Sequence, residues 1–303
     1  MEVNEKIEQP ESRTVVRAVP LRKKKSQWKE IWRRFRRNRA AMVGLVVMCV
    51  LIFSALFANI IAPEELDAQD LTRTFQTPSF KHIMGTDNLG RDMFSRVIYG
   101  TRTSLMIGFT AVSVALTIGC IIGSIAGYYG GKLDNILMRG IDILMATPNI
   151  LLAIAIASAL GPGLINVMIA VGVGAIPDYA RITRAAVLTV REREFIEAAR
   201  AIGGNDFRIV TRHILPNCLA PIIVQVTLGL SGAILSAAGL SFIGLGIQPP
   251  TPEWGYMLNV GRRYLRDYGH MVIFPGLAIV TVVLALNMVG DGLRDAFDPK
   301  LKR

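Results

Sequence analysis

The sequence has few charged residues for its length and lacks a phosphate-binding loop. Only 19% of its 303 residues are charged, whereas soluble domains contain about a quarter. No Gly-x-x-x-x-Gly-Lys-Ser/Thr motif is present, and this is the loop whose backbone cradles nucleotide phosphates. We therefore expect that the chain binds no cofactor and does not itself hydrolyse ATP.

Groupings of residues that carry out catalysis or hold metals are also missing. There is no His-Glu-x-x-His motif and no convergent Ser/His/Asp or Cys/His set. The three cysteines have no metal-site or disulfide spacing, so we predict small core residues. The three histidines are isolated, and we interpret them as surface or packing residues. The residues concerned are Cys49, Cys120, Cys218, His82, His213 and His270.

Acidic residues are absent from the middle of every predicted membrane span. Asp142 and Asp178 lie near predicted span ends. A proton- or sodium-coupled carrier usually needs a charge near the middle of the membrane. This pattern argues against that class of transporter.

What the chain does contain is apolar sequence arranged in long runs. Hydrophobic residues make up 51% of it and the mean hydropathy is +0.42, which indicates an all-α polytopic membrane protein. The net charge is +11, but Lys and Arg gather before the first apolar run and in the central polar segment 181–217. That distribution is a topology signal, and we expect no nucleic-acid partner.

The first 39 residues form a basic tail that we place in the cytoplasm. Residues 1–25 contain too few apolar residues to fold alone, so they are predicted to be disordered. Between residues 26 and 39, Arg side chains surround a stripe with the spacing i, i+3, i+4, i+7, typical of a helix lying on anionic lipid. The stripe consists of Trp28, Ile31, Trp32 and Phe35.

Six transmembrane helices are predicted within the domain 40–303, with both termini in the cytoplasm. The first apolar run is too long and begins too late for a cleavable signal sequence. Gly119 and Gly123 make a small-residue step that favours close helix packing, and Pro148 is expected to kink the third helix. In the fifth, Gly229, Gly232 and Gly239 mark close-packing or hinge positions. The predicted spans are 40–61, 104–127, 136–160, 164–179, 218–243 and 271–290.

Two loops on the opposite side of the membrane have recognisable local sequences. Residues 85–92 read GTDNLGRD within the predicted outer segment 62–102. Their oxygen ligands lack the alternation of a calcium loop, so we predict a Gly-punctuated turn that enters the next helix. Residues 248–255 read QPPTPEWG, and three prolines exclude a regular helix there.

The central polar segment 181–217 is predicted to form a helical hairpin on the cytoplasmic side. Phe195, Ala198, Ala199 and Ile202 share one helix face. Before that helix, Thr189-x-x-Glu192 fits a capping box. After it, Gly203-Gly204 stops the helix, Asn205 or Asp206 caps a second one, and Pro216 closes that second helix. The hairpin is either a connecting loop or a docking knob for a soluble partner.

The hairpin resembles the characteristic cytoplasmic loop of ABC importer permeases. Its matching residues are Glu197-Ala198-Ala199, then Gly203, then Ile214-Leu215-Pro216, while His213 departs from the family pattern. The resemblance implies a type I importer permease of MetI-like fold, in which this loop docks on an ATPase. The coupling residues that it implies are Phe195, Glu197, Ala198, Ala199, Ile202, Gly203, Leu215 and Pro216.

Three further segments resemble the dipeptide/oligopeptide/nickel branch of these permeases: GTDNLGRD, QPPTPEWG and the C-terminal GDGLRDAFDP. The resemblance implies a bacterial inner-membrane protein importing dipeptides or oligopeptides. Glutathione, nickel complexes or other small solutes are the alternative cargoes. The implied partners are membrane lipid, a homologous second permease, two ATP-binding subunits that hold ATP and Mg²⁺, and an extracytoplasmic solute-binding protein.

Few polar residues lie within the predicted spans, and their role is open. They are expected either to line a substrate pathway or to form hydrogen bonds between helices. The competing classes for the whole chain are a stand-alone channel, a secondary carrier and a membrane-bound enzyme, and the residue patterns above argue against each. The polar span residues are Asn149, Asn166, Gln225 and Asn287.

Overall fold

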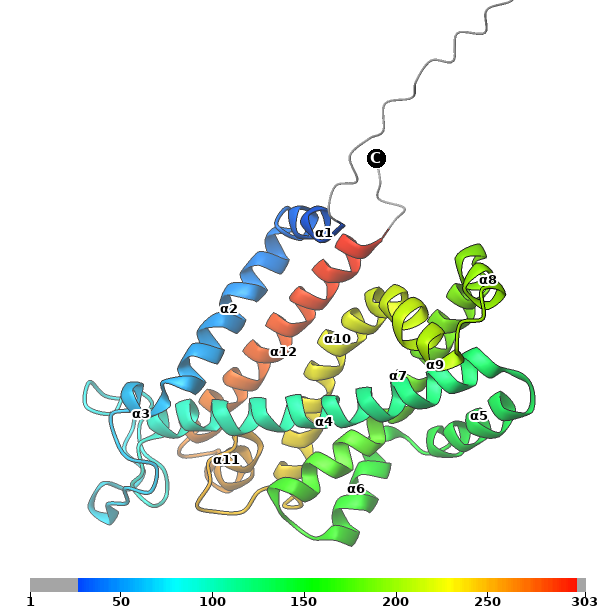
Figure 1. Ribbon diagram of the computed structural model, residues 1–303. Helices are drawn as coiled ribbons and strands as arrows, with labels where there is room; N and C mark the ends of the chain where they lie inside the picture. The colour runs from blue at the N-terminus through cyan, green and yellow to red at the C-terminus, as the bar shows by residue number, and fades with distance from the viewer. Residues whose placement is uncertain (1–26, 299–303) are drawn as a thin grey trace, which may run out of the picture.

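The computed structural model describes residues 27–298, and this part of the chain is helical, without a β-strand. Figure 1 shows long helices packed side by side, with shorter helices at their ends. The helices are α1 Gln27–Phe35, α2 Arg39–Leu56, α3 Ala58–Ile61, α4 Met93–Tyr129, α5 Gly131–Met145, α6 Asn149–Leu160, α7 Leu164–Arg191, α8 Glu194–Ala201, α9 Asp206–Ile209, α10 Leu215–Phe242, α11 Trp254–Gly261 and α12 His270–Phe297.

Five helices are long and apolar enough to cross a membrane: α2, α4, α7, α10 and α12. A sixth crossing results if α5 and α6 count as one span, but they meet at an angle of 83°. The prediction of one kinked helix over 136–160 is therefore wrong, because the chain breaks there into two helices. Pro148 lacks an N–H for the helix ladder and disfavours a helical Thr147 before it, so the break falls at this point.

Three spans extend well beyond their predicted limits, and one of them, α12, runs to Phe297 rather than ending near residue 290. Helix α4 begins at Met93 rather than near residue 104, because Asp92 caps it by accepting a hydrogen bond from the Ser95 amide at 2.8 Å. Helix α7 runs through the buried Pro177 to Arg191 and does not end near residue 179. Its second half packs along α4, and this packing keeps the helix intact despite the missing proline N–H.

Glycines bring α4 and α7 together, as the small-residue step predicts. A Cβ on Gly119 would lie 2.9 Å from the Ala180 amide nitrogen, and a Cβ on Gly127 would lie 2.9 Å from the Val187 Cβ. Gly123, between them, faces the α7 backbone in the same way. The two helices therefore touch backbone to backbone over several turns, which only small residues allow.

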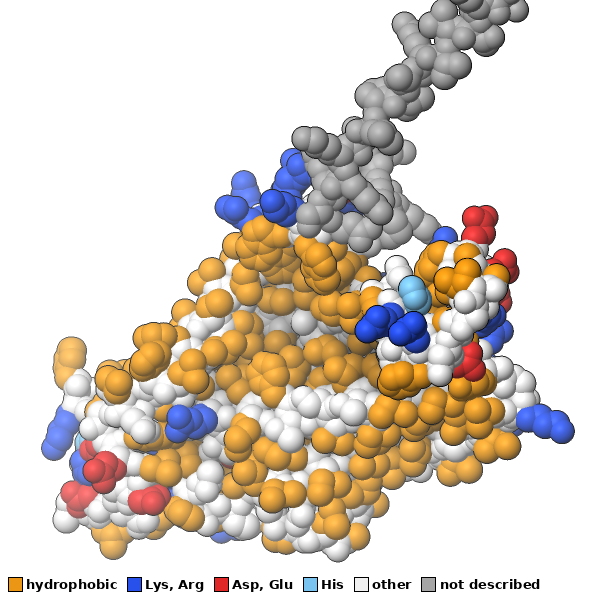
Figure 2. Space-filling view, in the orientation of Figure 1, with side chains coloured by type: hydrophobic (Ala, Val, Ile, Leu, Met, Phe, Trp, Pro, Cys, Tyr) orange, Lys and Arg blue, Asp and Glu red, His pale blue; other side chains and the backbone are white. Residues whose placement is uncertain are grey.

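At one end of the molecule, α1 packs against the last turns of α12 (Figure 1). Helix α1 ends at Phe35, earlier than the predicted 39, because Phe35 is buried and Asn38 caps α2. Trp28 and Trp32 remain exposed. Lys and Arg side chains gather at this end in Figure 2. The predicted tail 1–25 lies outside the described residues.

At the other end, the segment before α4 forms a turn with a buried polar interior. Gly85 and Gly90 both have positive φ, as the Gly-punctuated turn predicts. The carboxylate of Asp87 accepts a hydrogen bond from the Arg91 guanidinium at 2.7 Å, and both residues are buried. This cluster fixes the start of α4.

The proline-rich loop packs against that same start of α4. Residues 248–252 are not helical, as predicted, and α11 follows them. The fully buried Trp254 donates its indole N–H to the Val97 carbonyl at 3.0 Å. Burial raises the pKa of Glu253, whose carboxylate caps α11.

Most of the isolated cysteines and histidines have packing roles. Cys218 is buried and Cys120 partly buried, but Cys49 is exposed on α2, so its prediction as a core residue is wrong. His82 lies 3.0 Å from the Asp92 carboxylate, and His270 lies 3.0 Å from the Thr86 carbonyl, both buried. In residues 27–298 no group of His, Cys, Asp and Glu is placed to hold a metal ion.

Candidate functional site

The central polar segment forms the predicted helical hairpin, made by α8 and α9. Gly203 adopts a φ of +79° directly after α8, which is the left-handed stop expected there. The Asn205 side chain then caps α9 by accepting a hydrogen bond from the Phe207 amide at 2.9 Å. The hairpin projects from the helix bundle at the right of Figure 1.

Two predicted hairpin boundaries are wrong. Thr189 lies inside α7, where its hydroxyl donates to the Ala185 carbonyl at 3.0 Å, so no capping box forms with Glu192. Pro216 does not close a helix but lies in the first turn of α10, which a π-helical turn, Val210–Ile214, joins to α9. A proline is tolerated in a first turn because its missing N–H would have no helical partner there.

Buried isoleucines fix the hairpin to the bundle. Ile196, Ile209 and Ile214 are at most 1% exposed and pack in one cluster with Val187 of α7 and Cys218 of α10. Full burial of such a side chain contributes about 1.5–3 kcal/mol. The hairpin is therefore a packed element rather than a loosely tethered loop.

Polar contacts join the hairpin to the end of α4. The Tyr128 hydroxyl donates to the Asp206 carboxylate at 2.6 Å, and the Arg200 guanidinium lies 5.1 Å from the centre of the Tyr128 ring. Arg191, at the end of α7, donates to the Gly127 carbonyl at 2.9 Å. These contacts fix the hairpin's orientation as well as its position.

Both helices of the hairpin also expose apolar side chains. Phe195 is 45% exposed, Ile202 87% and Phe207 76%, and Ala198 lies exposed on the same side of α8. We call these four residues the docking face. In Figure 2 the hairpin carries hydrophobic side chains among acidic and basic ones. Exposed apolar side chains on one projecting hairpin make it a candidate interaction surface.

The docking face differs in two members from the predicted set. Ala199 is half-buried and packs against the isoleucine cluster, so it supports the hairpin from inside. Phe207 was missed, because it lies on α9 and outside the family motif. The only signal for it was its position two residues after a capping Asn205. Glu197 is exposed on α8.

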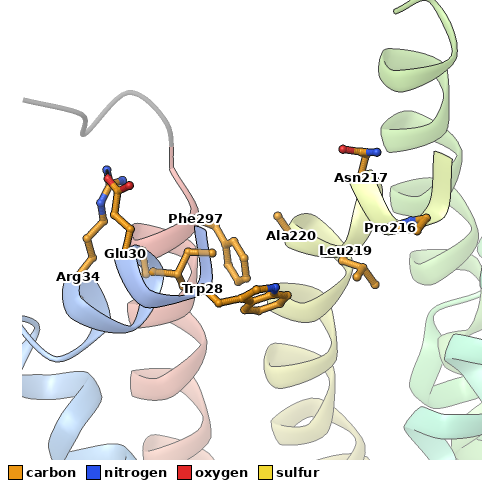
Figure 3. A pocket seen from close by; sticks show the side chains of 10 residues that line it. Trp28, Glu30, Arg34, Pro216, Asn217, Leu219, Ala220 and Phe297 are labelled. Atoms are coloured by element: carbon orange, nitrogen blue, oxygen red, sulfur yellow. Dashed lines mark hydrogen bonds and ion pairs between the residues drawn. The ribbon is translucent and has the colours of Figure 1, made fainter. Parts of the chain in front are cut away.

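The remaining predicted coupling residues, Leu215 and Pro216, lie at the foot of α10, beside the hairpin. Pro216 lines a groove of about 410 Å³ between α10 and α1. Figure 3 shows Trp28 pointing across this groove toward Leu219, with Phe297 of α12 beside it. The segments that line the groove, α1, the end of α12 and the start of α10, therefore lie together at one end of the molecule.

The four predicted pathway residues do not lie together. Asn149 and Gln225 line one cavity of about 250 Å³ between α6, α7 and α10. Asn166 instead donates to the Leu160 and Gly161 carbonyls, and Asn287 accepts a hydrogen bond from Ser231 at 2.7 Å. Asn166 and Asn287 therefore form the hydrogen bonds that one interpretation predicted, whereas Asn149 and Gln225 do not.

Asp178, predicted to lie near a span end, also lines this cavity. The extension of α7 to Arg191 puts Asp178 in the middle of a 28-residue helix.

The predicted close-packing glycines of α10 differ in the space beside them. A Cβ on Gly229 would collide with the Tyr179 side chain, whereas one on Gly232 or Gly239 would meet nothing within 4 Å.

Known families and relatives match almost the whole chain. Residues 119–303 match the family described as binding-protein-dependent transport system inner membrane component. Residues 26–78 match the N-terminal transmembrane domain of oligopeptide transport permease C. The chain is 48% identical to the dipeptide transport system permease protein DppC of Alkalihalophilus pseudofirmus, covering 91% of each chain.

One further relative and one solved structure are also similar to this chain. The glutathione transport system permease protein GsiD of Escherichia coli O157:H7 is 47% identical over 95% of this chain and 96% of that protein. An inward-facing MetNI methionine ABC transporter structure is 21% identical and covers 68% of this chain and 98% of that chain, with a TM-score of 0.56. At this identity the structural likeness concerns the fold alone, and it confirms the predicted MetI-like fold.

Proposed function

Because the chain belongs to the family of binding-protein-dependent transport system inner membrane components, we propose that it carries peptides across the inner membrane, driven by a partner ATPase. The chain is a multi-pass permease subunit of an ABC importer. Peptide cargo is supported by the names of relatives that are 44–48% identical to it. Glutathione, itself a small peptide, is the second candidate, supported by the 47% identical glutathione permeases.

The docking face is the feature from which we infer how the ATPase is coupled to the membrane spans. Phe195, Ala198, Ile202 and Phe207 form a small apolar surface on a hairpin that buried isoleucines hold in place. An apolar helix face of this size fits a groove on a soluble subunit. We propose that the ATPase receives this face, and that its closing motion passes through α8 and α9 to the spans.

The proposed assembly contains two permeases, two ATPases and one solute-binding protein. The structure supports a second permease through α10, where Gly232 and Gly239 have open space beside them. The ATPases would bind ATP and Mg²⁺ and dock at the hairpins, while the binding protein would dock at the opposite end. Both termini are proposed to lie in the cytoplasm, in keeping with the arginines around α1.

Ala198→Asp tests this proposal, because it places a charge in the middle of the docking face. The expected result is loss of the co-purifying ATPase and at least a tenfold fall in ATP-driven peptide uptake, since a buried unpaired charge is costly. Ala198 is a sharper choice than Ala199, because Ala199 packs inward and its replacement also disturbs the hairpin.

Ala40→Asp is the matched control, an exposed alanine in the first turn of α2 at the same end of the molecule. Its added carboxylate lies where the helix dipole favours it, so assembly and uptake are expected to stay normal. Normal uptake by Ala198→Asp would contradict the docking proposal. A purified chain that conducts solute without any ATPase would contradict the importer mechanism.

A further inference from the structure

The cavity between α6, α7 and α10 holds four polar side chains that have no partner within the protein. Asn149, Asp178, Gln225 and Ser236 all line it. In residues 27–298 none of these side chains makes a hydrogen bond or ion pair. Asn166, Asn287 and Ser231, which also lie in the spans, are satisfied by hydrogen bonds, whereas the buried hydroxyls of Ser124 and Ser241 are not.

Asp178 supplies the charge of this cavity. Arg181 acts electrostatically on this carboxylate, but its guanidinium is paired with Asp142 at 2.6 Å. The next arginine along α7, Arg184, is paired with Asp134 at 2.6 Å. The half-buried Asp178 carboxylate is thus left to act on the cavity itself. An ionisable side chain that faces a cavity from a membrane-spanning helix is costly to keep and marks a functional site.

The cavity has open space beside Gly232 of α10, which is exposed. A Cβ on Gly232, which lines it, would meet nothing within 4 Å. Its volume of about 250 Å³ is smaller than the roughly 300–1,000 Å³ of a typical ligand pocket. We therefore expect an opposing subunit to complete it.

We propose that this cavity binds the charged amino end of a peptide in transit, with Asp178 receiving the ammonium group. An ammonium offers three N–H donors to the carboxylate, and the amides of Asn149 and Gln225 can both donate to and accept from a peptide bond. Hydrogen bonds between ionised groups are the strong ones. This inference rests on the peptide cargo proposed above and names a binding site for it.

The test uses the complete importer with its binding protein in liposomes, and radiolabelled dialanine as the probe. Uptake and ATP hydrolysis are measured together, so that transport per ATP is the readout. In Asp178→Asn, ATP hydrolysis stimulated by the loaded binding protein is expected to persist, because the docking face is untouched. Peptide uptake per ATP is expected to fall about tenfold or more, the size of one hydrogen bond to a charged group.

Two further variants make the readout specific. Asp178→Glu keeps the carboxylate and is expected to restore most of the transport per ATP. Asp291→Asn makes the same substitution at an exposed position on α12, away from the cavity, and is expected to leave the ratio unchanged. A purely structural role of Asp178 would lower uptake and hydrolysis together.

Several outcomes would overturn the site. Transport per ATP by Asp178→Asn within twofold of the original would do so, as would a parallel loss of hydrolysis that Asp178→Glu does not rescue. If the Asp178→Asn variant no longer co-purified with the second permease, Asp178 would be an assembly contact instead. A sodium or proton requirement that disappears in Asp178→Asn would make it an ion site. Failure of the unaltered importer to take up any small peptide would remove the peptide proposal as well.

Discussion

At the scale of single residues, the buried carboxylate of Asp87 before α4 makes several hydrogen bonds and ion pairs at once. Asp87 accepts hydrogen bonds from the Leu89 and Arg91 amides at 2.8 and 3.0 Å, and from the Arg91 guanidinium at 2.7 Å. Arg96 lies 3.6 Å away on the first turn of α4. A buried carboxylate in such a network stabilises two cations at once.

Asp87→Asn is expected to destabilise the protein by about 3–5 kcal/mol, because it leaves buried guanidinium charges without their partner. The measurement is the thermal unfolding of the purified protein in detergent. Asp70→Asn is the control, in the same loop but only half-buried, where the carboxylate accepts a hydrogen bond from Thr72 and pairs with Arg73 at 3.2 Å. It is expected to change the melting temperature much less. Equal shifts in the two variants would show that burial of Asp87 is not the cause.

Residue roles were predictable only where the sequence holds a local signal. The helical spacing and the family motif indicated Phe195, Ala198 and Ile202 correctly as one exposed face. The same spacing did not predict that Ala199 turns inward, because that depends on which side of α8 meets the isoleucine cluster. Likewise, the sequence did not show that Asp178 faces a cavity, because that depends on how α6, α7 and α10 pack together.

At the scale of helices, the glycine seam between α4 and α7 gives a sharp test. In Gly123→Ala the new methyl would lie 2.8 Å from the Thr183 Cβ and 2.9 Å from the Arg184 amide nitrogen. Such overpacking costs about 1–3 kcal/mol. We expect a lower melting temperature in detergent and less protein in the membrane.

Gly140→Ala is the matched control for this seam. Gly140 lies inside α5, where a new Cβ would meet nothing within 4 Å. Alanine favours the helix over glycine by up to about 1 kcal/mol, so this variant is expected to be neutral or slightly more stable. Equal destabilisation by both changes would mean that the α4–α7 contact is looser than the structure indicates.

Prolines show why helix limits were the weakest part of the sequence prediction. Each proline removes one hydrogen bond, but the packing around it decides whether the helix breaks, continues or begins there. Pro148 separates two helices at 83°, Pro177 lies within one continuous helix, and Pro216 begins another. A sequence locates the missing N–H, whereas the angle of the chain depends on packing with distant helices.

At the scale of the whole molecule, the two ends should face opposite sides of the membrane. Phe80 is fully exposed in the loop before α4, and Arg37 is exposed between α1 and α2. In a background with Cys49 replaced by Ser, Phe80→Cys is expected to react with an impermeant maleimide on intact cells. Arg37→Cys is expected to react only after the membrane is opened. The reverse pattern would invert the proposed topology.

Helix α4 gives the molecule a single part that reaches both of these ends. It has 37 residues and is therefore about 55 Å long, from the Asp87–Arg91 turn to Tyr128 beneath the hairpin. The glycine seam holds it against α7 and prevents it from sliding independently. A displacement at one end of α4 is therefore expected to be transmitted to its other end. In this way we expect α4 to couple movements at the two ends of the molecule.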